Sequence, residues 1–454
     1  MDLTPDQMRR LGYAAIDRIV DSFATLPSQP VGRKGAPADL RSRLAVPFPE
    51  HGMAPEDALA ILDRDVFPYC MNLKHPRFFA FVPSPSNFAS VIGDLLTVGH
   101  NVFAGSWLGG SGAAALETVM IDWMAAKCGF TDEAEGLFLS GGSMANLTAL
   151  AVARHHKLGD DFGDGTIYYS DQTHSSIDRA LRVLGFAKRQ IRRVPTDDGL
   201  RISLPALREM TTADPRPFCV VANAGTTSTG AVDPLNELAD FCAERNLWLH
   251  ADGAYGAATL LTARGRKALA GVERVDSLTL DPHKWLFQPL ECGCLMVPNG
   301  RLLKETYAIN PAYLEDIHRH QEEINFCDRG VQLTRYSRAV KLWFSLQVFG
   351  LAKFRAAINR GFEIAEFAEA ELRREGWEIV TPAQMAIVTF RHPSLDNKGH
   401  ADLAEELTAS GFAFLSTTVL GGRTALRLCT INPRTTDDDI RETIVRLTRL
   451  AGGI

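Results

Sequence analysis

The sequence lacks the features by which membrane proteins and nucleic-acid-binding proteins are usually recognised. None of its apolar runs is long enough to span a bilayer, and it has no basic tail or long run of like charges. The formal net charge of the 454 residues is −6. We therefore expect neither a membrane nor a nucleic acid as a partner.

Cysteine is also scarce, with 8 residues scattered through the chain. Scattered cysteines in a long chain are typical of reduced thiols in a cytoplasm. The close pair Cys292 and Cys294 has no second cysteine or histidine cluster at zinc-binding spacing, so we expect strand packing there and no metal site. The segment Met1–Asp6 is polar and acidic and lacks the apolar core of a signal peptide. These absences predict a cytoplasmic protein.

What the chain does have is the composition of a large globular enzyme. Hydrophobic residues make up 46% of it and charged residues 22%, which is ordinary for a soluble protein. A chain of this length can bury a large core and is expected to form more than one domain.

Three regions with different patterns follow one another along the chain, and we expect three domains. Residues 1–75 are predicted to be helical, because Thr4-Pro5-Asp6-Gln7 is a capping box with proline at the first helical position. Residues 76–345 alternate short apolar strands with helices, which predicts an α/β domain with a mostly parallel central sheet and helices on both faces. Residues 346–454 predict a small C-terminal α+β domain that begins with a long helix. The strands expected in the central region are Gly136–Leu139, Thr166–Tyr169, Phe218–Ala222, Leu247–Ala251, Ser277–Leu280 and Cys294–Val297.

Residues that can carry chemistry gather where the predicted strands end. One apolar strand ends in Asp252, and another is followed by Pro282 and then by His283 and Lys284. Ligands of parallel sheets bind beyond the carboxyl ends of the strands. A lysine there can form a Schiff base with the aldehyde of pyridoxal 5′-phosphate (PLP), and a carboxylate can hold its pyridine nitrogen protonated. Each residue also has an ordinary explanation, since Asp252 could cap a helix and Lys284 could lie on the surface.

Two further features lie at the same predicted edge of the sheet. Ser140–Ser143 is a glycine-rich turn before a helix, where exposed backbone amides suit a phosphate, although Gly-Gly-Ser is also an ordinary turn. His174 follows the next strand, where an imidazole could stack on a flat ring or simply cap or pack. With Asp252 and Lys284, these features supply a phosphate cradle, a stacking group, a ring-nitrogen partner and a Schiff-base lysine. Together they favour PLP binding over coincidence.

On these residues the chain resembles the group II PLP-dependent decarboxylases, most of all those that act on aromatic L-amino acids. The Lys284 and Asp252 motifs are highly specific for that family, and their separation of 32 residues is the one that the family shows. The resemblance implies PLP-dependent transferase fold type I and decarboxylation of a substrate such as tyrosine, DOPA, tryptophan or phenylalanine to its amine and CO₂. The matching segments are His75–Phe81, Leu116–Trp123, Ser170–Ser176, Gly225–Thr227, Trp248–Tyr255 and Asp281–Trp285.

The resemblance implies a role for each residue of the cofactor site. Lys284 forms the Schiff base, Asp252 pairs with the pyridine nitrogen, and His174 stacks on the ring. Ala254 and Thr227 contact the other side and the edge of the ring. The residues implied to bind the phosphate are Gly142, Ser143, Met144 and His283.

The resemblance also implies which segments contact the substrate and how the chains assemble. The residues concerned are Phe81, Val82, Pro83 and Ser84 in one segment, and Phe103 and Gly105 in another. In similar proteins the second segment and the N-terminal helix cross to a partner subunit, which implies an obligate homodimer.

Three of these positions depart from the usual pattern of the family. Ser84 replaces the more common threonine but keeps the hydroxyl. Gly105 stands where a bulky residue is common, which predicts a wider or differently shaped pocket. Asp281 stands where many relatives have asparagine near the phosphate, and its charge would repel the phosphate unless the carboxylate is turned away or protonated.

The segment Asn310–Leu314 matches a mobile loop whose tyrosine, here Tyr313, protonates Cα after CO₂ leaves in similar decarboxylases. Relatives that deaminate oxidatively often carry phenylalanine there, so Tyr313 favours decarboxylation, although an exposed tyrosine with no role would look the same. Three alternatives stay open. They are an aldehyde synthase or transaminase on the same scaffold, a decarboxylase of an acidic or aliphatic amino acid, and a cofactor-free protein that kept the fold.

Overall fold

The computed structural model describes residues 2–309, 311–320 and 322–453, and the chain divides into two compact units. Unit 1 comprises Met1–Pro83, Glu366–Pro382 and Thr389–Ile454. Unit 2 comprises Ser84–Ala365 and Ala383–Val388. Each unit therefore combines segments that are far apart in the sequence.

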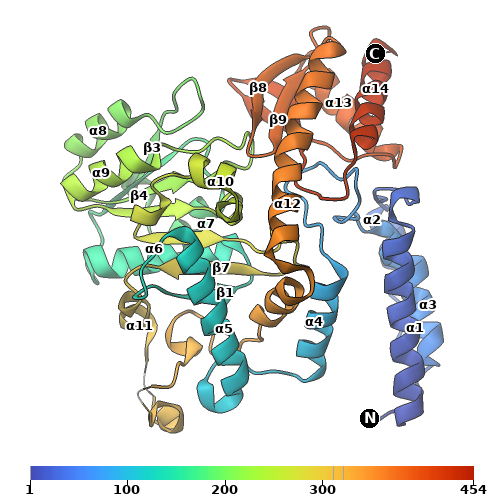
Figure 1. Cartoon of the computed structure of the whole chain (residues 1–454), viewed down its shortest axis with the longest axis horizontal. Helices are drawn as coiled ribbons and strands as arrows, with labels where there is room; N and C mark the ends of the chain where they lie inside the picture. The colour runs from blue at the N-terminus through green and yellow to red at the C-terminus, as the bar shows by residue number, and fades with distance from the viewer. Residues whose placement is uncertain (1, 310, 321, 454) are drawn as a thin grey trace. The chain divides into compact units, whose positions relative to one another are not determined.

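A seven-stranded sheet forms the centre of unit 2, with its strands in the order β1-β7-β6-β5-β4-β2-β3 (Figure 1). The strands from β6 to β3 are parallel, whereas β7 is antiparallel to both of its neighbours. The predicted mostly parallel sheet is confirmed, and each expected strand is present. Strand β3 was not expected, because its sequence Ile-Arg-Arg-Val is short and half charged. The bounds are β1 (Glu135–Leu139), β2 (Thr166–Ser170), β3 (Ile191–Val194), β4 (Pro217–Asn223), β5 (Trp248–Asp252), β6 (Ser277–Leu280) and β7 (Gly293–Val297).

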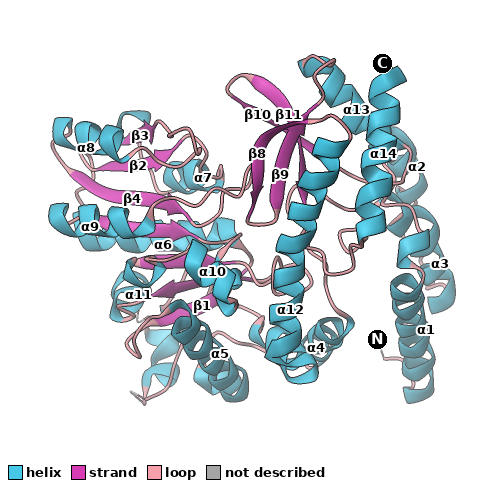
Figure 2. Ribbon diagram, turned by 45° about the horizontal axis from the view of Figure 1, so that its top comes forward, coloured by secondary structure: helices cyan, strands magenta, loops and turns pink. Residues whose placement is uncertain are grey.

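Helices cover both faces of this sheet (Figure 2). All residues of β2, β5, β6 and β7 are buried, which requires cover on both sides. On one face, apolar residues of α6, α7 and α11 share a core with the strands. The helices of unit 2 are α4 (Phe88–Gly99), α5 (Trp107–Cys128), α6 (Gly142–Leu158), α7 (Ser176–Val183), α8 (Leu204–Ala213), α9 (Leu235–Arg245), α10 (Ala263–Ala268), α11 (Arg301–Tyr307) and most of α12 (Ala339–Arg374).

Unit 1 combines the N-terminal helices with a sheet of strand order β10-β11-β9-β8, the tip of whose β8–β9 hairpin is grouped with unit 2. The predicted helix cap is confirmed, since Thr4 and Gln7 cap each other's backbone and Pro5 begins the helix. No helix in the described ranges is both long and apolar enough to cross a membrane. The elements are α1 (Pro5–Ala24), α2 (Pro37–Leu44), α3 (Pro55–Asp65), β8 (Glu378–Gln384), β9 (Ile387–Arg391), α13 (Asn397–Ala409), β10 (Ser416–Leu420), β11 (Arg423–Cys429) and α14 (Asp437–Gly453).

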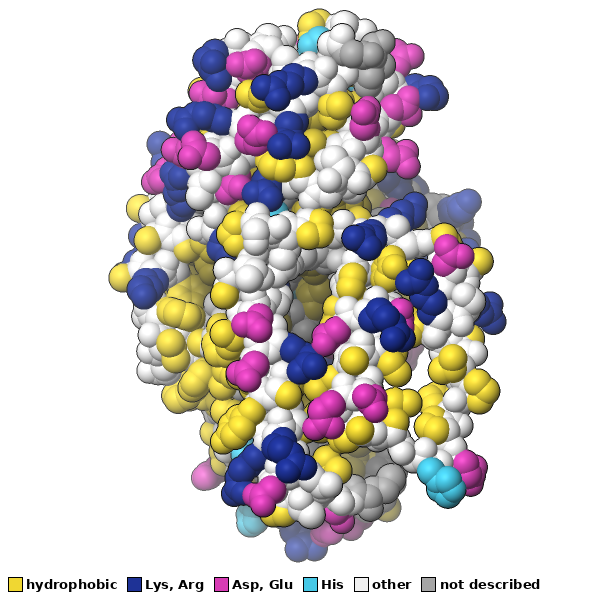
Figure 3. Space-filling model, turned by 90° about the vertical axis from the view of Figure 1, so that its right-hand side faces the viewer, with side chains coloured by type: hydrophobic (Ala, Val, Ile, Leu, Met, Phe, Trp, Pro, Cys, Tyr) yellow, Lys and Arg dark blue, Asp and Glu magenta, His cyan; other side chains and the backbone are white. Residues whose placement is uncertain are grey.

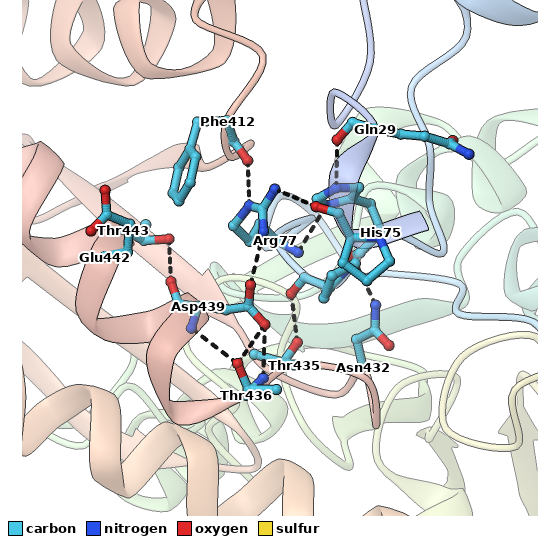
Figure 4. Close-up of polar contacts among 12 residues, drawn as sticks. Gln29, His75, Arg77, Phe412, Asn432, Thr435, Thr436, Asp439, Glu442 and Thr443 are labelled. Atoms are coloured by element: carbon cyan, nitrogen blue, oxygen red, sulfur yellow. Dashed lines mark hydrogen bonds and ion pairs between the residues drawn. The ribbon is translucent and has the colours of Figure 1, made fainter. Parts of the chain in front are cut away.

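The motif that begins at His75 connects the N-terminal segment of unit 1 to its C-terminal segment (Figure 4). The Arg77 guanidinium donates to the Phe412 carbonyl at 2.8 Å and pairs with Asp439 of α14 at 3.0 Å. The amide of Asn432 donates to the His75 carbonyl at 2.8 Å. His75 is fully buried, and burial lowers its pKa to about 4. This part of the family motif therefore has a structural task, which is to hold residues 75–77 against the C-terminal segment.

Candidate active site

A cavity of about 320 Å³ lies in unit 2, at the carboxyl ends of the parallel strands. Its volume is that of a small-ligand site. It is lined by segments that follow β1, β2, β4, β5 and β6, as the topology of a parallel sheet favours. Every residue predicted to bind the cofactor lines it, namely Gly142, Ser143, Met144, His174, Thr227, Asp252, Ala254, His283 and Lys284.

The glycine turn between β1 and α6 forms one wall of the cavity. A Cβ atom added to Gly142 would lie 2.8 Å from the Cβ of Ala254, so a larger residue would not fit without movement. Helix α6 begins at Gly142, and its first backbone amides point out of the helix end. Such an end attracts anions, which suits the predicted phosphate.

Lys284 reaches the cavity from the turn after β6. Its Nζ lies 3.0 Å from Oδ2 of Asp281, which is 2% exposed, and the other oxygen of that carboxylate is buried without a hydrogen-bond partner in the described chain. His283 donates from Nδ1 to the Cys292 carbonyl at 2.7 Å, and burial lowers the pKa of His283. The Ser84 hydroxyl donates to the His283 carbonyl at 2.7 Å. These contacts hold the lysine-bearing turn against the cavity.

Asp252 and His174 stand at the ends of β5 and β2. The Asp252 carboxylate accepts hydrogen bonds from the Ala254 backbone at 3.2 Å and from the Asn146 amide at 2.9 Å. His174 Nδ1 accepts the backbone N–H of Ser176 at 3.2 Å, so the neutral ring carries its proton on Nε2. Burial lowers the pKa of His174, which favours that neutral form.

Several residues that line the cavity were not predicted from the sequence. Asn223 ends β4 directly opposite Asp252 in the strand register, so the same strand-end signal could have found it. Asn146 lies four residues after Gly142 and therefore on the same face of α6. Ser176 follows His174 closely and has its own polar contacts.

None of the predicted substrate residues is among those that line the cavity. Phe81, Val82 and Pro83 belong to unit 1. Phe81 is 61% exposed and has a φ of 49°, which is unusual for a bulky residue. Its N–H donates to Ser416 Oγ at 3.1 Å, and its carbonyl accepts from the guanidinium of Arg427. These bonds at both ends of the residue hold the exposed ring in place.

The remaining predicted substrate residues, Ser84, Phe103 and Gly105, are also absent from the cavity lining. A Cβ atom on Gly105 would lie 2.3 Å from the Leu333 carbonyl and 2.5 Å from the Phe103 ring, so packing within the chain itself requires glycine. Tyr313 belongs to a short 3₁₀ helix, Ala312–His318, and its side chain lies outside the described part of the structure, as does Asn310.

Comparisons with known proteins agree with this geometry. A family model for the pyridoxal-dependent decarboxylase conserved domain matches residues 37–393. The chain belongs to this family. An aromatic-L-amino-acid decarboxylase of Bacillus atrophaeus is 48% identical over 464 aligned positions, which cover 99% of this chain and 97% of that protein.

Solved structures are similar over the full length of the chain. Oryza sativa TDC with PLP and tryptamine has a TM-score of 0.94 at 29% identity, over 100% of this chain and 99% of that one. Catharanthus roseus tryptophan decarboxylase in complex with L-tryptophan has a TM-score of 0.92 at 28% identity, with the same coverage. Together with the family match, they confirm fold type I, PLP as the cofactor, and the activity of a PLP-dependent amino-acid decarboxylase, which is a lyase.

The residues that line the cavity of this decarboxylase suit PLP, independently of the comparisons. It offers an amine at Lys284, a carboxylate at Asp252 and a glycine turn at a helix N-terminus. These are the groups that an aldehyde, a pyridine nitrogen and a phosphate require.

Proposed function

We propose that this enzyme decarboxylates an aromatic L-amino acid of the tyrosine, DOPA, tryptophan or phenylalanine type to its amine and CO₂. The observation that carries the proposal is the 48% identity, over 99% of the chain, with an aromatic-L-amino-acid decarboxylase. The similar structures that hold tryptamine and L-tryptophan support the same substrate class.

Within the cavity, we propose that Lys284 attaches the cofactor covalently and that Asp252 pairs with its ring nitrogen. Bound PLP supplies an electron sink that weakens the bond between Cα and the carboxylate of an amino acid. Asp252 favours this chemistry because a carboxylate keeps the ring nitrogen cationic. Burial lowers the pKa of His174, which favours its neutral form, and in this proposal its ring stacks on the cofactor while Gly142 and Ser143 offer backbone amides to the phosphate.

Proton transfer to Cα is the step that distinguishes an amine product from an aldehyde. We propose that Tyr313 donates this proton, with the Nε2–H of His174 beside the reacting atoms. A phenol is a suitable general acid when it is held next to a basic carbon.

A second candidate function is aldehyde synthesis, since a phenylacetaldehyde synthase of Petunia hybrida is 30% identical over 95% of this chain. Tyr313 favours decarboxylation over this alternative, because the resembling synthases often carry phenylalanine at that position. An aldehyde synthase would release ammonia and hydrogen peroxide along with CO₂.

The experiment is a substrate screen with the purified holoenzyme. Tyrosine, DOPA, tryptophan, 5-hydroxytryptophan and phenylalanine are compared with glutamate and diaminobutyrate, and CO₂, amine, ammonia and peroxide are measured in each reaction. We expect equal amounts of CO₂ and amine from at least one aromatic substrate. Turnover of glutamate or diaminobutyrate alone would contradict the substrate class, and peroxide in amounts equal to CO₂ would contradict the reaction.

We further propose that the enzyme is a cytoplasmic homodimer. Helix α1 has no buried residue within the single chain, and its Met8, Tyr13 and Val20 are exposed. Figure 3 shows hydrophobic side chains exposed between charged ones on the face that carries α1. A partner subunit would cover such a surface. All eight cysteines are free thiols, as a cytoplasmic location favours.

In this proposal the three regions of the sequence keep separate tasks. Residues 1–75 form the dimerisation segment, residues 76–345 the PLP-binding domain and residues 346–454 the small C-terminal domain. The exposed apolar residues of α1 support the first of these assignments, and the cavity residues, which lie between 140 and 284, support the second.

A further inference from the structure

One buried asparagine, Asn146 in the first turns of α6, hydrogen-bonds four side chains at once. Its amide nitrogen donates to Asp252 Oδ2 and to Ser176 Oγ, each at 2.9 Å. Its amide oxygen accepts from Thr279 Oγ1 at 2.7 Å and from His250 Nε2 at 3.0 Å. Both donor hydrogens and both lone pairs of the amide are therefore used. Asn146 is 1% exposed, so water does not compete for these bonds.

The Asp252 carboxylate determines the orientation of the Asn146 side-chain amide. An ionised carboxylate can only accept hydrogen bonds, so the NH₂ group of Asn146 must face it. The amide oxygen then faces His250 and Thr279. Burial lowers the pKa of His250 to about 4, so this ring is neutral and its single proton lies on Nε2, facing Asn146.

The far end of the same chain of bonds allows this direction. The indole N–H of Trp248 can only donate, and it donates to Ser277 Oγ at 2.9 Å. Ser277 can then donate its own proton to His250 Nδ1, which lies 2.8 Å away. In this arrangement Nδ1 accepts and the His250 proton lies on Nε2, as the Asn146 amide oxygen requires.

Ser176 extends the chain of bonds from Asn146 to His174. Its hydroxyl oxygen accepts from Asn146, and its own proton can be donated to His174 Nδ1 at 2.9 Å. The backbone N–H of Ser176 donates to the same ring nitrogen at 3.2 Å. The hydrogen bonds can thus run in one direction from Trp248 to His174, which lines the cavity.

We propose that Asn146 is a positioning residue that orients two cofactor contacts, Asp252 directly and His174 through Ser176. The inference rests on the function proposed above for Asp252 and His174. Asn146 lines the cavity, but its amide is fully occupied by protein partners, so its effect on the cofactor passes through its neighbours.

The test compares two cofactors on the apoprotein. The dissociation constant is measured for PLP and for an analogue in which carbon replaces the ring nitrogen. Asp252 can favour only the cofactor that has the nitrogen, so the wild-type protein is expected to prefer PLP. Asn146→Leu removes the hydrogen bond to the Asp252 carboxylate and is expected to reduce this preference about tenfold, as befits a hydrogen bond to a charged group. Asn146→Ser, which removes the same bond with a smaller side chain, is expected to act in the same direction and serves if the leucine variant does not fold.

Equal weakening of both cofactors by the Asn146 variants would overturn the proposal, because a purely structural role predicts that result. If Asp252→Asn removes the preference for PLP while the Asn146 variants keep it, the inference fails and the proposed role of Asp252 stands. A preference that survives Asp252→Asn would overturn both.

Two further variants complete the design. Ser176→Ala cuts the branch to His174 and is expected to shift the Nδ1 resonance of His174 in ¹⁵N-histidine-labelled apoprotein while the preference for PLP is kept; an unchanged resonance would overturn the His174 branch. The signal is assigned by its loss in His174→Gln.

Asn432→Leu is the matched control, since it removes a buried asparagine of unit 1 that hydrogen-bonds the Lys74 and His75 carbonyls. Its preference for PLP is expected to equal that of the wild type, and a loss as large as that of Asn146→Leu would overturn the proposal.

Discussion

Two sets of predicted site residues occupy different parts of the fold: those expected to hold the cofactor and those expected to contact the substrate. The cofactor residues all line one cavity of unit 2, whereas none of the predicted substrate residues lines it. The cofactor residues follow strand ends, which a parallel sheet brings to one edge. The substrate residues come from segments 81–84 and 103–105, and the first of these begins in unit 1. One unit of one chain therefore supplies every residue predicted to hold the cofactor, whereas the residues predicted to contact the substrate belong to both units and are not among those that line the cavity.

Deletion of residues 1–60 tests whether the substrate half depends on a partner subunit. If the substrate half needs a partner subunit, the deletion is expected to abolish soluble, active enzyme, because it removes α1 and the apolar residues proposed to contact the partner. Decarboxylation and sedimentation equilibrium measure the effect. Tyr13→Glu combined with Val20→Glu keeps the helix and is expected to weaken the dimer alone. A full-length chain that is active as a monomer would contradict the account.

Tyr313→Phe tests the substrate half without disturbing the cofactor half. We expect PLP to bind as in the wild type, since the hydroxyl is not needed there, and amine formation to fall about 10²-fold because Cα loses its proton donor. The unprotonated carbon can transfer two electrons to oxygen, so the products should shift toward aldehyde, ammonia and hydrogen peroxide. Tyr307→Phe is the control, since that hydroxyl only donates to the Thr148 carbonyl. Wild-type rates of amine formation in Tyr313→Phe would show that another group is the donor.

Asp281→Asn tests how the charge near Lys284 affects cofactor binding. The Asp281 carboxylate lies beside Lys284 and the glycine turn, where an added Cβ on Gly142 would be 3.0 Å from it. Removing this charge should lower the dissociation constant for PLP about tenfold, because like charges repel strongly at short range. Fluorescence titration of the apoprotein measures it, with Asp240→Asn, an exposed carboxylate of α9, as control. Weaker binding would mean that Asp281 instead supports the lysine.

A further prediction concerns acid, which should destabilise both units in part through the buried His75 and His250. Burial lowers the pKa of His75 in unit 1 and of His250 in unit 2 to about 4, against about 6.5 in an unfolded chain. Below pH 6.5 these histidines bind protons in the unfolded chain but not in the folded protein. The free energy of unfolding therefore decreases as the pH is lowered below 6.5, and it has its full value only above that pH. For His250 the loss at pH 5 is about 2 kcal/mol.

Urea unfolding at pH 7 and pH 5 measures this loss. His75→Gln and His250→Gln should each show a smaller decrease between the two pH values than the wild type, whatever their stability at pH 7. The same decrease in all three proteins would mean that other groups cause the acid sensitivity.

Some parts of the fold and of the cofactor site could be predicted from the sequence, and others could not. The apolar runs that end in Asp252 or lead to Lys284 indicate both a strand and the reactive residue at its end, so the local sequence is enough to predict them. Asn146 is different, because its partner Asp252 is 106 residues away and only the packing of α6 on the sheet brings them together.

The grouping of the chain into two units was also not visible in the sequence. Asn432 hydrogen-bonds the carbonyl of His75 across 357 residues, and no local pattern indicates that contact. For the same reason, the role of the His75–Arg77 motif as a structural connection within unit 1 emerges only from the folded chain. Periodicity describes single elements well, whereas contacts between distant segments depend on tertiary packing.

The lysine that carries the bound cofactor can be identified chemically. Borohydride reduction of the holoenzyme, followed by proteolysis and mass spectrometry, finds the lysine that carries the pyridoxyl group. We expect the label on Lys284, within the peptide that contains Asp281–Trp285, and no label on Lys284→Ala. A label on any other lysine, or none on the wild-type protein, would contradict it.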